Sequence, residues 1–283
     1  VTDTLQVTID LLGGDVVKAN LTKYTITEGS DDAYSLLRPN AAALYVAQSG
    51  LIGANGPDAN PEGRPLYTSP VMQYTLNNDT LSVPLSWIGS DGMRITKTFV
   101  FTRGSNGVEL QQTIANGSSN TIIVQPYAQL KQTFALPESN MFMPTYRGAA
   151  YGTEEEQYQK YSFGDIEDES LRVATPAGWI AMIEHYFLSA WVPPQDKTNT
   201  IYTRAIGTEY ATIGYTSEPV SIVSGAATRL DSVLYLGPKD HHTLKPSAKD
   251  FNIAVDYGFI WFIYDWLVWH LQIIPGWAVN VLC

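Results

Sequence analysis

The chain has 283 residues, 45% hydrophobic and 16% charged, so it can bury one large core or two modest ones and is not intrinsically disordered. Its 28 acidic and 17 basic residues give a formal net charge of -11, which repels phosphate backbones, so no nucleic-acid partner is expected. The single cysteine, Cys283, excludes an internal disulfide and a metal site built on thiolates.

The chain opens with a predicted β-hairpin. Apolar and polar residues alternate from Thr4 to Leu11, which is typical of a strand with one buried face. Gly13 and Gly14 then reverse the chain into a second strand over 16–21. Frequent glycine and proline interrupt residues 50–70, which predicts a long irregular connection at the surface.

A meander of strands follows, separated by short turns rich in Gly, Asn and Ser, and this pattern predicts an antiparallel sheet. In the last of these strands, apolar side chains alternate with amides, a tyrosine and a lysine between Ile122 and Lys131. We therefore expect one apolar face and one polar face that is hydrated or binds a ligand. The predicted strands of the meander are 81–87, 93–102, 108–114 and 121–133.

Later strands are predicted over 179–191, 200–205, 210–215, 220–224 and 226–236. The helical period is confined to 153–160, where Thr153 and Glu156 match a capping box, and to the region after Pro246. The sequence thus predicts a mainly β protein, with a large antiparallel sandwich over 1–245 and a C-terminal helical segment over 246–283.

No motif for a serine nucleophile elbow, a phosphate loop, a dinucleotide fold or a zinc protease occurs. His241 and His242 are adjacent, but neighbouring side chains on a strand point to opposite faces, so neither a metal site nor a cofactor is expected. Seven acids between Glu154 and Glu169 have two interpretations: a solvated acidic rim, which we favour, or a face that docks a partner.

Aromatic residues in the middle of the chain also have two interpretations. They either line a cleft that stacks an extended ligand or fill the space between two sheets, and the second is more usual in a sandwich. The candidates for such a cleft are Trp179, Tyr186 and Trp191.

Residues 257–283 hold four of the seven tryptophans, and Asp265 is their only formally charged residue. As a helix, residues 259–274 would be about 24 Å long, shorter than a hydrocarbon core of about 30 Å. We therefore expect a helix in the headgroup plane of a membrane rather than a span or a helix docked on the sandwich. The candidate membrane-interface residues are Trp261, Phe262, Trp266, Trp269 and Trp277.

Several strings, in their order and spacing, resemble a known family: Leu5-Gln-Val-Thr-Ile-Asp10, Leu130-Lys-Gln-Thr-Phe134, Arg147-Gly-Ala-Ala-Tyr151, Ala190-Trp-Val-Pro193, Tyr235-Leu-Gly-Pro238 and Val255-Asp-Tyr-Gly-Phe-Ile-Trp-Phe262. Together they resemble the large periplasmic domain of the YidC family of bacterial membrane protein insertases, over nearly the whole chain. After Phe262 the family usually continues with a Gln-Pro pair and a basic amphipathic helix, whereas this tail has no Lys or Arg.

The resemblance implies a β-supersandwich, similar in fold to sugar mutarotases and carbohydrate-binding modules and closed by C-terminal helices. It implies a periplasmic domain of a Gram-negative inner-membrane protein, with a transmembrane helix before Val1 and the insertase core after Cys283. The implied partners are SecDF and SecYEG of the Sec translocon and nascent membrane proteins.

A face for such a partner is expected within 143–183, at Tyr146, Arg147, Tyr151, Tyr158 and Tyr161. The implied function is non-enzymatic assistance of membrane protein insertion and folding. The alternative is a carbohydrate-binding or carbohydrate-active sandwich protein. Mutarotase-type catalysis needs a histidine and an acid in the cleft, and only His185 lies in a predicted strand, so sugar chemistry is not expected.

Overall fold

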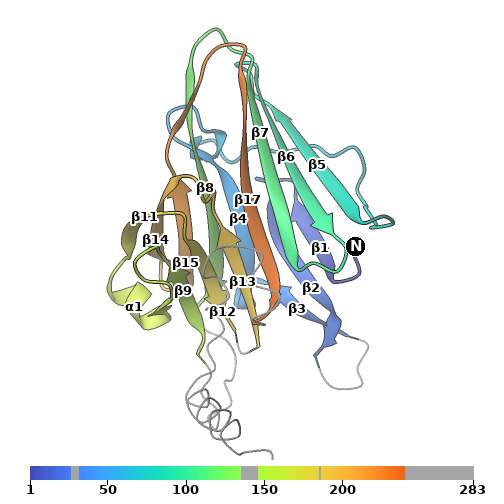
Figure 1. The fold of residues 1–283 in the computed structure, drawn as a ribbon, viewed down its shortest axis with the longest axis vertical. Helices are drawn as coiled ribbons and strands as arrows, with labels where there is room; N and C mark the ends of the chain where they lie inside the picture. Colours follow the sequence, from blue (N-terminus) through green and yellow to red (C-terminus); the bar gives the residue numbers. More distant parts are fainter. Residues whose placement is uncertain (27–31, 135–145, 185, 240–283) are drawn as a thin grey trace, which may run out of the picture.

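The computed structural model describes residues 1–26, 32–134, 146–184 and 186–239. In these residues two antiparallel sheets pack face to face, and the long strands of the meander extend to the upper end of the molecule (Figure 1). The fold class predicted from the sequence, a large antiparallel β-sandwich, is confirmed.

The first sheet has nine strands in the order β1-β2-β4-β8-β15-β14-β11, with β3 paired to β2 and β16 paired to β8. Its strands are β1 (Leu5–Asp10), β2 (Asp15–Thr25), β3 (Ala33–Leu37), β4 (Tyr45–Ile52), β8 (Ile122–Thr133), β11 (Arg172–Pro176), β14 (Thr198–Ile206), β15 (Tyr210–Ser217) and β16 (Val220–Ile222).

The second sheet has eight strands in the order β10-β9-β12-β13-β17-β7-β6-β5. Its strands are β5 (Thr80–Ile88), β6 (Met93–Thr102), β7 (Gly107–Asn116), β9 (Gly148–Gly152), β10 (Gln159–Ser162), β12 (Trp179–Ile183), β13 (Phe187–Val192) and β17 (Ala227–Pro238). The described helices are short: the 3-10 turns η1 (Ala41–Ala43) and η2 (Pro57–Ala59), and α1 (Phe163–Asp168).

The main core fills the space between the sheets, because alternate residues of most strands point inward. A second, smaller core lies along β9, β12, β13 and β17. All residues of β9, β12 and β13 are buried, so both faces of these strands are covered. This explains why their sequences are mostly apolar and do not alternate.

The predicted opening hairpin is confirmed by the pairing of β1 with β2. Gly13 and Gly14 have φ angles of 78° and 65°, which favour glycine, and they form the reversal between the strands. The four meander strands are likewise confirmed as β5 to β8, and the segment after Ile52 is irregular as expected, apart from η2. Residues 246–283, with their predicted helix, lie outside the described residues.

The helix predicted over 153–160 is wrong. The hydroxyl of Thr153 accepts a hydrogen bond from the Glu156 backbone at 2.9 Å, but this contact closes a turn between β9 and β10. The capping box instead belongs to Ser162 and Asp165 at the start of α1. The single strand predicted over 179–191 is also wrong, because the chain reverses after Ile183 to form two paired strands.

Among the described residues, the structure contains no helix with the length and apolar character that crossing a membrane requires.

Candidate functional site

Four charged side chains meet in the interior of the sandwich near the first β-turn. Lys97 on β6 is 0% exposed, because it occupies an inward position between the core residues Ile95 and Phe99. Asp15 begins β2, and its side chain is also buried. The other two charges, Asp58 and Arg64, come from the irregular segment after β4. We call these four residues the buried ion cluster.

Lys97 reaches from one sheet to the other. Its Nζ donates hydrogen bonds to the carbonyl oxygens of Gly13 and Ser49, both at 2.7 Å, and to the Ser49 hydroxyl at 3.1 Å. Burial lowers the pKa of Lys97 to about 8, while Asp58 and Asp15 act in the opposite direction. The ammonium is therefore held by backbone and hydroxyl oxygens, with the carboxylates as more distant counter-charges.

Arg64 joins the two acids of the cluster. Its Nε lies 2.8 Å from Asp58 Oδ1, and its guanidinium also binds Asp15 and donates to the Ser49 carbonyl at 2.9 Å. Asp58 additionally accepts a hydrogen bond from the backbone of Leu51 at 2.9 Å. Every charge of the cluster is thus engaged inside the fold, an arrangement suited to fixing the irregular segment rather than to acid–base chemistry.

A chain of polar side chains extends from this cluster across the nine-stranded sheet. Gln48 donates to Asp15 at 2.7 Å, Gln129 donates to Gln48 at 2.9 Å, and the hydroxyl of Tyr202 donates to Gln129 at 3.0 Å. The ring of Tyr202 crosses β15 because Gly214 has no side chain: a Cβ there would lie 2.5 Å from the ring. The polar face predicted for β8 is confirmed, and its amides bind groups of the neighbouring strands: Gln129 binds Gln48 of β4, and Gln125 donates to the Ser217 carbonyl of β15 at 2.9 Å.

A second buried charge is Glu184, which follows β12. Its carboxylate accepts hydrogen bonds from the Tyr34 hydroxyl at 2.7 Å, and from Arg38 and Gln132 at 2.8 Å each. Burial, together with the charge of Glu184, raises the pKa of Tyr34. Because three side chains, from β3, from the residue directly after it and from β8, converge on one carboxylate, Glu184 ties the β12–β13 turn to the nine-stranded sheet.

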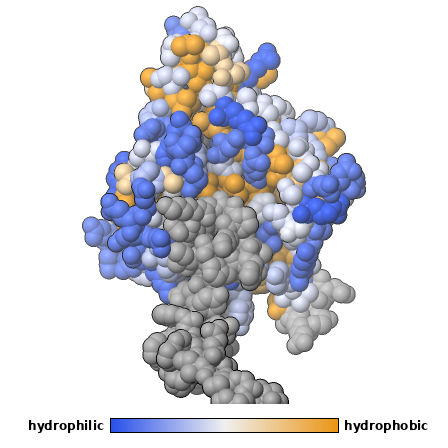
Figure 2. Space-filling view, in the orientation of Figure 1, coloured by the Kyte–Doolittle hydropathy of each residue, from blue (hydrophilic) through white to orange (hydrophobic). Residues whose placement is uncertain are grey.

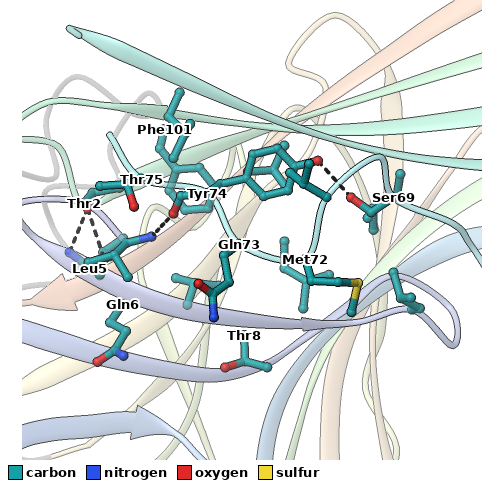
Figure 3. Close-up of a pocket in the computed structure, with 18 residues that line it drawn as sticks. Thr2, Leu5, Gln6, Thr8, Ser69, Met72, Gln73, Tyr74, Thr75 and Phe101 are labelled. Atoms are coloured by element: carbon teal, nitrogen blue, oxygen red, sulfur yellow. Dashed lines mark hydrogen bonds between the residues drawn. The ribbon is translucent and has the colours of Figure 1, made fainter. Parts of the chain in front are cut away.

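An apolar groove lies between the edge strands of the two sheets, β1 and β5. Its volume is about 470 Å³, and residues 69–75, here called the strap, cross it. In Figure 3 the side chains of Met72 and Gln73 extend from the strap toward β1. Within the strap the Tyr74 hydroxyl lies 2.9 Å from the hydroxyl of Ser69, which also donates to the Pro84 carbonyl of β5 at 3.3 Å. The 18 lining side chains include no charged residue.

The structure places the predicted partner residues on and beside the β9–β10 hairpin. Tyr151 is only 7% exposed and belongs to the main core, whereas Tyr146, Tyr158 and Tyr161 are half-buried. Arg147 donates to the carbonyl oxygens of residues 133 and 134, both at 2.8 Å. Tyr158 stacks on Trp179, and the Tyr161 hydroxyl donates to the Glu169 carbonyl. Their part in partner binding stays a prediction.

Two of the three cleft candidates lie inside the protein. Trp179 and Trp191 are 1% and 0% exposed and pack in the smaller and the main core, respectively. Tyr186, in contrast, is 67% exposed at the β12–β13 turn. The three residues therefore do not form one surface. His185 and the tail residues Trp261, Phe262, Trp266, Trp269 and Trp277 lie outside the described residues.

The predicted acidic rim is a solvent-exposed surface. Its seven acids, Glu154, Glu155, Glu156, Asp165, Glu167, Asp168 and Glu169, are all exposed, and the flank of the molecule around α1 is largely hydrophilic (Figure 2). Among the described residues, no group of three or more His, Cys, Asp or Glu side chains is arranged to hold a metal ion.

Sequence reasoning did not find the buried ion cluster or the groove. The sequence does contain an indication of the buried ion cluster, because Lys97 stands at an alternate position of its strand together with the apolar residues that point inward. Its partners Asp58 and Arg64 lie in the irregular segment, where no sequence period indicates which side chains point inward. The groove arises where two sheet edges meet, and this depends on the topology.

Two antiparallel sheets with this arrangement form a β-sandwich whose fold is similar to that of galactose mutarotase-like proteins. A galactose mutarotase related enzyme from Lactobacillus acidophilus superposes with a TM-score of 0.54 at 9% identity, over 83% of this chain and 95% of that one. A galactose mutarotase-like protein from Lactobacillus casei gives 0.51 at 9% identity, over 83% and 98%. At such identity the likeness concerns the fold alone.

The sequence comparison is more specific. The family model of the YidC periplasmic domain matches residues 1–270. The membrane protein insertase YidC of Pseudoalteromonas atlantica is 45% identical over 285 residues, and that of a Shewanella species (strain W3-18-1) is 40% identical over 287. The alignments cover 99% of this chain but 52% and 53% of those proteins, so the chain spans about half their length. The chain belongs to the YidC periplasmic domain family.

Proposed function

We propose that the chain is the periplasmic domain of an inner-membrane insertase, and that it assists the insertion and folding of membrane proteins alone or with the Sec translocon. The observation that supports this most strongly is the 45% identity to a membrane protein insertase over 99% of the chain. Because the chain spans about half of such proteins, the activity is proposed for the whole protein, to which this domain contributes binding and positioning.

The proposed role is non-enzymatic. The charged groups of the buried ion cluster and of Glu184 support this role. All of them are engaged in contacts that hold segments of the fold together, rather than facing a substrate. The carbohydrate alternative has only the sandwich fold in its favour. On the polar face of the nine-stranded sheet, the amides of Gln48 and Gln129 bind each other.

The proposed partner surface is the β9–β10 hairpin with the acidic rim beside it. Tyr158 and Tyr161 present part of their rings there, next to exposed acids, and a polar and aromatic surface of this kind suits a transient interface. SecDF is the partner that the family resemblance suggests. Tyr151 is too buried to make this contact itself.

A photo-crosslinker at Tyr158 in the full-length protein is expected to capture SecDF in membranes. The matched control position is Asn78, which is exposed on the far side of the eight-stranded sheet, beyond β5. Capture from Asn78 but not from Tyr158 would refute this surface.

The function itself is tested by exchange. In the test protein, the periplasmic domain of a YidC protein is replaced by this chain. We expect this chimera to support the insertion of a membrane protein that requires YidC. We also expect its periplasmic domain to contact SecDF. A chimera that is made and stays folded, yet has lost the SecDF contact, would contradict the proposed cooperation. Saturable mutarotation or glycoside cleavage by the pure chain would contradict the non-enzymatic role.

A further inference from the structure

The strap runs beside β1, and the contacts between the two segments are made where each of them begins and ends. The ammonium of Val1 donates to the Tyr74 carbonyl of the strap at 2.7 Å. At one end the backbone of Tyr67 donates to the Leu11 carbonyl at 2.8 Å, and at the other the backbone of Leu76 donates to the Val1 carbonyl at 2.9 Å. Between these points the structure records no backbone hydrogen bond from the strap to β1. The groove occupies this gap.

The outer edge of β1 is open within the gap. Thr4 accepts a hydrogen bond from the β2 residue Thr22, so the backbone N–H and C=O groups of the even-numbered residues point to β2 and those of the odd-numbered residues point outward. The pairing register shifts between Thr8 and Ile9, and Leu11 faces outward again beyond this shift. Leu11 satisfies its outward carbonyl with the strap. For Val7 and Ile9, no partner on this side is found among the described residues. Their N–H and C=O groups form a free template for one more strand.

The side chains around this edge complement an uncharged, apolar segment. The floor consists of Leu5, Val7, Ile9, Leu81, Val83, Leu85 and Phe101, and no lining side chain is charged although the chain carries a net charge of -11. At the mouth, Met72 is 80% exposed. A flexible thioether suits a surface that accepts varied apolar side chains. A charged segment would lose its hydration here without gaining a partner.

From these observations we propose that the groove binds an extended, uncharged peptide segment, which adds a strand to β1 beneath the strap. The backbone of the peptide pairs with Val7 and Ile9, and alternate apolar side chains enter the groove. This rests on the proposed function in one respect: it identifies the bound segment as an unfolded apolar stretch of a membrane protein that is being inserted. The binding chemistry itself does not require that activity.

The test measures fluorescence anisotropy with the 283-residue chain and a labelled, end-capped octapeptide of alternating Val and Thr. We expect saturable binding that weakens at least tenfold when alternate peptide amides are N-methylated, because the methyl groups remove the donors that a new strand needs. The protein variant Met72→Glu should weaken binding similarly. Its matched control is Val223→Glu, an exposed apolar residue away from the groove, which should leave binding unchanged.

A third variant, Val7→Pro, removes one outward N–H and is compatible with an edge strand. Circular dichroism establishes that this variant is folded, and it should also lose at least tenfold in affinity. Absence of saturable binding, or binding unaffected by N-methylation and by Met72→Glu, overturns the proposal. So does a dimer of the chain that is sensitive to Val7→Pro and binds no peptide. If the chimera supports insertion while the peptide does not bind, only this inference fails.

Discussion

The Nζ atom of Lys97, in the eight-stranded sheet, lies 2.7 Å from the carbonyl oxygen of Ser49, in the nine-stranded sheet. The same carbonyl also accepts a hydrogen bond from Arg64. One backbone oxygen of β4 therefore connects the two sheets and the irregular segment. Loss of either cation should affect all three parts together.

Lys97→Met is expected to lower the free energy of unfolding by about 2–4 kcal/mol, because the oxygens of Gly13 and Ser49 lose their buried donor and two carboxylates remain with a single cation. Urea denaturation followed by circular dichroism measures the change. Lys18→Met, on the exposed side of β2, is the control and should change stability by less than about 0.5 kcal/mol. Equal stability of the two variants would contradict the role of Lys97.

The same lysine predicts a pH dependence. Burial lowers its pKa from 10.5 to about 8 in the folded state, so above pH 8 the unfolded chain binds more protons than the folded one. The contribution of Lys97 to stability should therefore rise with pH, by about 1–2 kcal/mol between pH 8 and 9.5. Denaturation across this range should show the rise in the natural chain relative to Lys97→Met. A constant difference between the two proteins would show that the lysine does not titrate there.

Arg64→Met removes the guanidinium that joins Asp15 and Asp58. It should destabilise the protein by about 3–5 kcal/mol, because two buried carboxylates lose their hydrogen-bonded cation. Limited proteolysis should then cut within residues 50–70 before the rest of the sandwich. For comparison, Arg103→Met removes a half-exposed arginine 3.9 Å from Asp79, and its effect should be below about 0.5 kcal/mol. Unchanged protection of residues 50–70 in Arg64→Met would refute the anchoring role.

The tail provides a prediction from sequence alone. Four tryptophans and several aliphatic residues after Tyr257 should give the intact chain an affinity for neutral vesicles of several kcal/mol, at about 25 cal/mol per Å² of apolar area. Flotation should separate the intact chain from a chain truncated after Tyr257, which should stay in the aqueous phase. Anionic lipid should add little, since the tail has no Lys or Arg. If neither protein floats and tryptophan emission does not shift, the interfacial helix is excluded.

The sequence predicts those strands correctly in which apolar and polar residues alternate and only the apolar face is buried. In β8 the alternation from Ile122 to Leu130 gives the strand and its buried face directly. The same rule fails between Trp179 and Trp191, since strands buried on both faces do not alternate and the turn between them has no glycine or proline. The pair Thr153 and Glu156 fits both a helix start and a closed turn, and only the hairpin pairing decides between them.

The candidate sites depend on contacts between distant segments, such as Lys97 with Ser49 and Tyr67 with Leu11. The alternation of residues in β1 predicts its apolar face, but it does not predict that β1 lies at the edge of a sheet. They also do not show that another edge lies opposite. For this reason the groove could not be predicted from the sequence, although most of its lining residues could be assigned to strands.

The anchoring of residues 58 and 64 has a consequence for engineering the domain. Long irregular surface connections are usually permissive sites for inserting a tag or a reporter domain. Here an insertion between Asp58 and Arg64 would separate two halves of a buried ion cluster. The tight turns at Gly207 and Gly225 are better choices, because a Cβ at either glycine would meet no atom within 4 Å and neither turn contributes to the cluster.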